Sequence, residues 1–282
     1  MTTQLRIVIP SAELLTPKTW LPDMAVLVET CGRISHKSED AMGPGSFEKF
    51  IPKVAHKLGH ESITEHIQLT VRIIGSRAMS HQLVRHRIAA YTQESQRYCD
   101  YSNDEKVAAM NIIVPPSIMA VAGTQNPSLN ASNWRGMHDM RIVRLPRKEM
   151  PDCGQPTPPY PAPIDSVLCY VREGQDDPLP IYVDVDGGVA FVFFNSIMTS
   201  YESYLFLRDH GIPPEDSRFV LPNASKTEVA ATYNIRTWRH VFRMRCDKHA
   251  QWEIRMIMQE ILKMFIELLP VFFKDQVGLL EP

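Results

Sequence analysis

Proline limits where this chain of 282 residues can place helices and strands. Much of it lies in the runs VPPS, NPSLNASN, QPTPPYPAP and QDDPLP, and proline fits neither a helix interior nor a central strand. We therefore expect an irregular insertion at about residues 111–185, with a short hairpin formed by IDSVLCYVREG and PIYVDVDGG. A mobile insertion and an ordered surface layer both fit this composition, and the aromatic and aliphatic residues favour partial order.

The stretches on either side of the insertion carry the periodic patterns of regular elements. Alternating and β-branched residues predict strands at residues 4–9 and 68–76. Helical spacing of apolar residues predicts helices at residues 23–35, 47–59, 77–84, 193–211 and 249–270. The apolar stripe of the last helix faces a core or a partner subunit. We expect a mixed α/β (α+β) fold, a single domain over residues 1–282 in which long helices flank a small sheet.

Charge and cysteine content exclude several classes of protein. Thirty Lys and Arg against 32 Asp and Glu give a net charge of -2, so no overall positive charge attracts a nucleic acid polymer or an anionic membrane. We find no leader pattern and no apolar run long enough to span a bilayer. The five cysteines are scattered without a CxxC pair, which is typical of a reducing compartment. We predict a cytoplasmic protein.

Four short segments concentrate polar residues that core packing does not require, and the first is GHESITEH. Together with His56 it offers imidazoles and carboxylates at His60, Glu61, Glu65 and His66, which can bind a metal. The segment lacks the spacing His-Glu-x-x-His, and Gly59 interrupts the helix that would align these side chains. Helix capping is a second interpretation. We favour a third, a loop that binds a ligand.

The second segment is QLVRHRIAAYTQESQRY, residues 82–98. If the helix continues to Arg85, Gln82 and Arg85 share one face and can reach a common ligand. Three consecutive residues of a helix point in three directions, so the Arg-His-Arg run addresses different groups or leaves the helix. The polar Gln93, Ser95 and Arg97 alternate, as in an extended segment. Because the planar guanidinium matches phosphate oxygens, we predict an anion site rather than a solvated basic helix end.

The third and fourth segments are SRFVLP, which contains Arg218, and NIRTWRHVFRMRCDKHAQWE. The fourth has the polar residues Asn234, Arg236, Arg239, His240, Arg243, Arg245 and His249. Apolar residues at helical spacing lie among them, so some arginines must approach the buried face. A buried guanidinium needs an anion or several acceptors. For Arg239 and Arg243 the alternative is an ion pair with Asp247, Glu253 or Glu260.

Missing motifs narrow the chemistry further. The chain has no GxGxxG, GxxxxGK[ST] or GxSxG. Cys99 and Cys246 lie in cationic stretches that can lower a thiol pKa, but neither has a clear helix N-terminus or a base beside it. The residues alone therefore predict a protein that binds phosphorylated, planar, nucleotide-like ligands, and they leave the reaction open.

The order of these segments resembles that of a known family. RHRIAAYTQES fits the pattern Arg-His-Arg, seven residues, Ser, and resembles the signature of flavin-dependent thymidylate synthases. The likeness extends to LGHESITEH, QRY, SRFVLP, NIRTWRHVFRMR and HAQWEI, in the same order. It covers about residues 1–115 and 190–270 and leaves the proline-rich insertion unmatched.

The resemblance implies a reaction and an assembly. The reaction is reductive methylation of dUMP to dTMP, with methylenetetrahydrofolate as carbon donor, NADPH as reductant and FAD as hydride carrier, without a protein nucleophile. The assembly is a homotetramer whose active sites lie between subunits. A silent nucleotide- or flavin-binding protein of the same fold is the alternative, and metal-dependent hydrolysis through His56, His60, Glu61 and His66 ranks last.

The resemblance also assigns residues by position. Those implied for FAD are Ser62, Arg85, His86, Arg87, Gln93, Asn234, Ile235, Arg236 and His240, with His60 lining the flavin and folate side. Those implied for dUMP are Gln82, Arg85, Gln93, Glu94, Ser95, Gln96, Arg97, Arg218 and Arg245. Arg245 would stabilise negative charge that develops on the uracil. Gln93 and His240 stand where some members have Glu and Asn, and each can still form hydrogen bonds.

Overall fold

The computed structural model of the chain describes residues 3–102, 109–123, 140–146, 166–171, 179–180 and 188–280. Their contacts divide the chain into two units, the first within Met1–Ile9, Ser76–Ala78 and Glu94–Thr227, and the second within Pro10–Gly75, Met79–Gln93 and Glu228–Pro282. In these ranges, no helix has both the length and the apolar character that crossing a bilayer requires.

The first unit contains a five-stranded sheet in the order β5-β1-β6-β7-β8. Its strands are β1 (Gln4–Ile7), β5 (Met110–Ile112), β6 (Arg141–Pro146), β7 (Ser166–Val171) and β8 (Leu179–Pro180). β1 runs parallel to β5, and the other neighbours are antiparallel. Leu5 pairs with Met110 on one side and Ile142 on the other, so β1 brings three buried side chains into register between β5 and β6.

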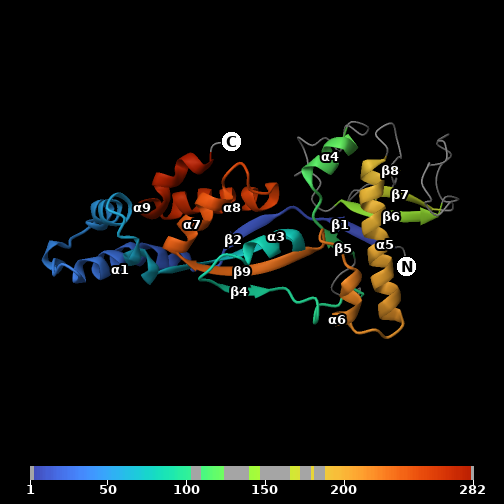
Figure 1. Cartoon of the computed structure of the whole chain (residues 1–282), viewed down its shortest axis with the longest axis horizontal. Coiled ribbons are helices and arrows are strands. Elements are labelled where there is room, and N and C mark those ends of the chain that lie inside the picture. The colour runs from blue at the N-terminus through green and yellow to red at the C-terminus, as the bar shows by residue number, and fades with distance from the viewer. Residues whose placement is uncertain are drawn as a thin grey trace. The chain divides into compact units, whose positions relative to one another are not determined.

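Helices complete the first unit. They are α4 (Pro116–Gly123), α5 (Val189–Asp209), α6 (Pro214–Ser217) and the 3-10 helix Arg218–Val220. The long helix α5 contacts both α4 and β7, as Figure 1 shows. Phe194 and Met198 of α5 are fully buried in the same core as Leu5 and Ile112. Burial of this apolar surface stabilises the helix against the sheet.

The second unit has a four-stranded sheet in the order β2-β3-β9-β4. Its strands are β2 (Ser11–Leu14), β3 (Gln68–Ser76), β4 (Ala90–Gln93) and β9 (Lys226–Asn234). β9 alternates strictly between buried and less buried residues, and β3 does so as far as Gly75, which is the pattern of strands with one face on a core. Leu69, Val71 and Ile73 from β3 and Tyr233 from β9 supply that face.

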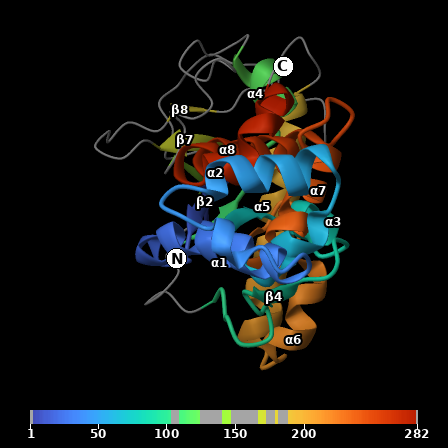
Figure 2. The ribbon, with the colours of Figure 1, turned by 90° about the vertical axis from the view of Figure 1, so that its left-hand side faces the viewer.

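Helices cover the apolar face of this sheet. They are α1 (Leu21–Ile34), α2 (Phe47–Ile51), α3 (Arg77–Leu83), α7 (Ile235–Arg245), α8 (Trp252–Leu268) and α9 (Pro270–Phe273), with 3-10 or π turns at Lys18–Trp20, Glu39–Ala41, Pro52–Lys57, Glu61–His66 and Lys274–Leu280. α8 contacts α7 and β2, and α1 contacts α2, which lies beside it in Figure 2. Asn234 caps α7, because its Oδ1 accepts a hydrogen bond from Thr237 N at 2.8 Å.

Most predicted elements are confirmed. The strands expected at residues 4–9 and 68–76 are β1 and β3, and the four helices expected at residues 23–35, 77–84, 193–211 and 249–270 are α1, α3, α5 and α8, within a few residues. The mixed α/β class is confirmed, although the described residues contain two sheets and not one.

The prediction of one continuous α-helix over residues 47–59 is wrong. Only residues 47–51 are α-helical; a π turn follows over residues 52–57, and Gly59 then takes a positive φ of 76°. The predicted hairpin is confirmed where it is described, since Cys169 of β7 pairs with Pro180 of β8, and residues 181–187 lie outside the described ranges. The single domain with an insertion at about 111–185 stays a prediction.

Candidate functional site

The Arg-His-Arg run lies in a turn that follows α3. The helix ends at Leu83, and His86 N donates to Leu83 O at 3.2 Å to close the turn. The helix therefore does not continue to Arg85, and of the two possibilities for the Arg-His-Arg run the structure shows that it leaves the helix. His86 is only 6 % exposed, and Arg85 and Arg87 on either side of it are exposed. The motif thus alternates outward, inward and outward.

Arg245, the last residue of α7, meets the buried imidazole. Its Nε–H donates to His86 Nε2 at 2.9 Å. A guanidinium can only donate, so Nε2 must be the acceptor and the proton of the neutral ring must be on Nδ1. Burial of His86, and then the charges of Arg245 and His240, lower the pKa of the imidazole to about 4. The imidazole is therefore neutral at pH 7.

This pKa predicts how stability responds to acid. The unfolded chain takes up the proton near pH 6.5 and the folded chain near pH 4, so the stabilisation is complete above pH 6.5 and is lost as the pH falls toward 4. At roughly 1.4 kcal/mol per pKa unit the loss is about 3 kcal/mol. Urea unfolding at several pH values measures it, with His86→Gln as a control that cannot titrate. A difference between wild type and control that stays constant from pH 7 to pH 4 would contradict the prediction.

Two tyrosines hold the backbone of this turn. Tyr91 Oη lies 2.8 Å from His86 O, 2.9 Å from Leu83 O and 2.7 Å from Tyr233 Oη. Because a phenol has one proton, Tyr91 donates to one of the two carbonyls and accepts from Tyr233. Burial raises the pKa of both phenols, which keeps them protonated. We missed both residues because we predicted no strand at residues 90–93 or 226–234, and an aromatic residue by itself signals packing.

The segment GHESITEH lies beside α7. Arg236 forms ion pairs with Glu65, from Nη1 to Oε1 at 2.5 Å, and with Glu61, from Nε to Oε2 at 3.5 Å. Arg243 Nη1 lies 3.8 Å from Glu61 Oε1. The first and fourth polar segments therefore meet at Glu61 and Glu65. His60 and Ser62, the neighbours of Glu61 in sequence, are exposed.

The predicted ion-pair partners of two arginines were wrong. Arg243 pairs with Glu61, and the 3 %-exposed Arg239 pairs with Asp275 through two hydrogen bonds of 2.7 Å. Sequence favoured Asp247, Glu253 and Glu260 because they are near in the chain. The actual partners come from distant segments that the fold brings to α7.

Several other predicted site residues are engaged in contacts within the second unit or are buried there. Gln93 Nε2 donates to Ser80 Oγ at 3.0 Å, and Asn234 uses Oδ1 as the helix cap. The side chain of Ile235 is fully buried, so only its backbone is available to a ligand. Gln82 is partly buried on α3, and His240 is exposed on α7.

The remaining predicted residues belong to the first unit. β4 ends at Gln93, and Tyr98 N and Cys99 N both donate to Ser95 O, at 3.1 and 2.9 Å, to form a turn. The extended course predicted through Ser95 and Arg97 was therefore wrong. Glu94 binds Lys226 and Tyr101, and Gln96 is buried.

Arg97 and Arg218 come together around one glutamate. Arg97 Nε donates to the carboxylate of Glu215 at 2.9 Å, and Arg218 Nε donates to the backbone O of Glu215 at 3.0 Å. The first pair is exposed, at 53 % for Arg97 and 46 % for Glu215, and solvent screens the attraction between exposed charges. An incoming anion can replace Glu215 at small cost.

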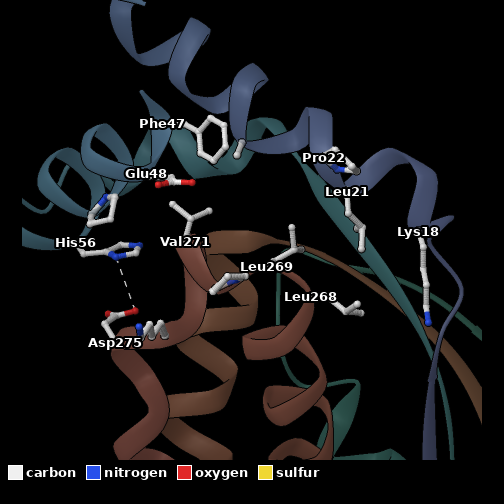
Figure 3. Close-up of a pocket in the computed structure, with 14 residues that line it drawn as sticks. Lys18, Leu21, Pro22, Phe47, Glu48, His56, Leu268, Leu269, Val271 and Asp275 are labelled. Atoms are coloured by element: carbon white, nitrogen blue, oxygen red, sulfur yellow. Dashed lines mark ion pairs between the residues drawn. The ribbon is translucent and has the colours of Figure 1, made fainter. Parts of the chain in front are cut away.

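A separate pocket lies in the second unit (Figure 3). Its volume is about 760 Å³, and its walls include Leu21, Phe47, Leu269 and Val271. At one end His56 Nδ1 lies 3.8 Å from Asp275 Oδ1, and burial, followed by the charge of Arg239, lowers the pKa of His56. Of the residues predicted for FAD or dUMP, none lines this pocket. In the described ranges, no group of three or more His, Cys, Asp or Glu could hold a metal, so metal-dependent hydrolysis gains no support.

Comparison with known proteins identifies the family. The family model described as "Thymidylate synthase complementing protein" matches residues 17–271. The chain belongs to this family. The likeness to flavin-dependent thymidylate synthases that the Arg-His-Arg motif predicted is thereby confirmed.

Two relatives carry the name "Flavin-dependent thymidylate synthase". The one from Geobacter sulfurreducens is 29% identical over 261 residues, which is 90% of this chain and 82% of that one. The one from Pyrococcus furiosus is 29% identical over 246 residues, 87% of this chain and 71% of that one.

Two solved structures are similar in fold. The UMP/dUMP methylase PolB from Streptomyces cacaoi, bound with 5-Br dUMP, has a TM-score of 0.61, 22% identity and coverage of 99% of both chains. Thymidylate Synthase X from Helicobacter pylori, with FAD and dUMP, has a TM-score of 0.56, 17% identity and coverage of 97% of this chain and 100% of that one.

Proposed function

We propose that this chain converts dUMP to dTMP by reductive methylation, with methylenetetrahydrofolate as carbon donor, NADPH as reductant and FAD as hydride carrier. The observation that carries the proposal is the contact between Arg245 and His86, which joins two of the motifs by which the chain resembles its family. The names of the relatives, and the nucleotides bound by the structural neighbours, support the same substrate class.

Arg245 is the residue that we propose activates the pyrimidine. Attack on the uracil ring without a protein nucleophile requires negative charge to develop on N3 and its flanking carbonyls, and a fixed cation lowers the energy of that state. Cys246 is the neighbouring thiol, and burial raises its pKa to about 12, so it is protonated at pH 7. The thiol is thus a poor nucleophile, and activation falls to the guanidinium.

The exposed cations of the second unit fit a phosphate-bearing cofactor. Arg85 and Arg87 are exposed, and within the described residues neither forms an ion pair, so their guanidinium forks are free for phosphate oxygens. The residues proposed to hold FAD are His60, Ser62, Arg85, Arg87, Gln93, Asn234, Ile235, Arg236 and His240. When bound, the flavin supplies hydride transfer, which no side chain can perform.

The cations of the first unit fit the phosphate of dUMP. We propose that the nucleotide contacts Gln82, Arg85, Gln93, Glu94, Ser95, Gln96, Arg97, Arg218 and Arg245. Arg97 and Arg218 already meet at Glu215, and their guanidinium groups can instead bind a phosphate in bidentate fashion. We further propose a cytoplasmic homotetramer of single-domain subunits, with the insertion at about 111–185, in which residues 93–97 serve a neighbouring subunit's site.

Purification with added FAD tests the function directly. We expect a yellow protein with a flavin absorption spectrum that oxidises NADPH only when dUMP is present, and that forms dTMP when methylenetetrahydrofolate is added. Omitting dUMP is the matched control. A colourless protein that makes no dTMP would refute the proposal, and binding of FAD and dUMP without turnover would indicate a silent binding protein.

A further inference from the structure

We propose that His86 is a positioning residue for Arg245 and not a flavin ligand: its imidazole accepts the Nε–H and fixes the direction in which the guanidinium points. This inference rests on the proposed function, because the group being positioned is the one that activates the pyrimidine. It replaces the role that the family resemblance implied for His86.

The first argument is geometric. Arg245 is the last helical residue of α7, so its long side chain begins where the helix ends and, without an anchor, can adopt many rotamers. The single hydrogen bond at 2.9 Å engages Nε and leaves both Nη groups available. A side chain that is held in one direction before substrate binds has already lost its rotational entropy. That entropy is then not lost during the reaction, so the activation free energy is lower.

The second argument concerns charge. A carboxylate at this position would anchor Nε equally well, but it would neutralise the guanidinium and weaken its attraction for negative charge on the uracil. Within the described residues Arg245 forms no ion pair, and its anchor is a neutral ring. A neutral acceptor fixes the direction of the cation and leaves its full charge for the substrate.

The third argument is the rigidity of the anchor. The ring of His86 is buried, and its Nε2 is already used by Arg245. Its backbone is held on both sides, by the hydrogen bond from His86 N to Leu83 O and by Tyr91 Oη at His86 O. Tyr91 is in turn fixed by Tyr233, which is 1 % exposed. An imidazole held this way points inward, whereas Arg85 and Arg87 face outward.

The test compares His86→Leu and His86→Gln with His210→Leu, which removes an exposed histidine from the other unit. We expect kcat for dTMP formation to fall about 100-fold in His86→Leu, the size expected when a reacting group is misplaced by about 1 Å. FAD content and the KM for NADPH should stay unchanged. The amide oxygen of His86→Gln can accept the Nε–H and should restore part of kcat, and His210→Leu should resemble wild type.

A second measurement does not depend on activity or on a folded leucine variant. In the wild-type protein, ¹⁵N NMR at pH 7 should find His86 as a neutral ring protonated on Nδ1, with an Arg245 Nε–H signal that shifts in His86→Gln. An Nε2-protonated ring would overturn the inference. So would unchanged kcat in His86→Leu, or a loss of FAD in proportion to the loss of activity. A wild-type protein that makes no dTMP would instead refute the proposed function, and the NMR result would still decide whether His86 holds Arg245.

Discussion

Replacing Arg245 by alanine should lower kcat for dTMP formation by about 10²- to 10³-fold, the cost of removing one preorganised donor from a developing negative charge. FAD should remain bound, because the exposed arginines proposed for its phosphates are untouched. The measurement is steady-state dTMP formation together with the flavin absorption spectrum of the purified variant.

The matched control is Arg243→Ala, which removes the same side chain two residues earlier on α7. Arg243 is 46 % exposed and lies 3.8 Å from Glu61, so its ion pair contributes little. We expect this control to keep kcat close to that of wild type, since Arg243 is not among the residues proposed to bind dUMP or FAD and its exposed ion pair adds little stability. If Arg245→Ala retained the rate of the control, the guanidinium would have no part in activating the pyrimidine.

Replacing Trp238 by alanine should lower the free energy of unfolding by about 3–5 kcal/mol. Trp238 is fully buried on α7, and its Nε1 donates to Leu69 O at 3.0 Å. Its ring lies edge-on to Tyr233 at 4.5 Å and to Phe265 at 5.2 Å between centroids. Alanine would leave a large cavity and remove the hydrogen bond from the indole to Leu69 O.

Urea unfolding followed by far-ultraviolet circular dichroism measures this change. The control is Met244→Ala on the same helix, where the side chain is 48 % exposed and its loss should cost less than about 1 kcal/mol. Because Trp238 packs against Tyr233, which fixes Tyr91 and the turn of His86, residual folded protein should also lose activity. A loss of stability no larger than that of the control would contradict this account of the core.

The elements that sequence predicted well are those whose pattern is set by a large apolar face. β3 alternates from Gln68 to Gly75, and α8 carries its stripe over 17 residues, so local periodicity matched the tertiary environment. β2 and β4 have four residues each, too few for a period to stand out. β9 alternates over nine residues, yet we did not predict it.

Sequence nominated residues for the candidate site but did not predict their contacts. The density of cations identified Arg85 and Arg245 as candidates, because closely spaced arginines need anions nearby. Arg218 was a candidate from the separate segment SRFVLP. Sequence could not show that His86 turns inward, because the same Arg-His-Arg letters fit a helix, a strand or a turn. Its partner Arg245 is 159 positions away, and such a pairing exists only once β9 and α7 have folded against β4.

The burial of Cys246 has a pharmacological consequence. Thymidine nucleotides are needed for DNA replication, so compounds that trap a reactive cysteine are an obvious way to stop an enzyme that makes them. The thiol of Cys246, next to Arg245, is 4 % exposed and protonated at pH 7, so it should react slowly with electrophilic drugs and cellular oxidants. If Arg245 activates the pyrimidine as we propose, an inhibitor would instead compete for its guanidinium, as a uracil mimic that carries a negative charge would do.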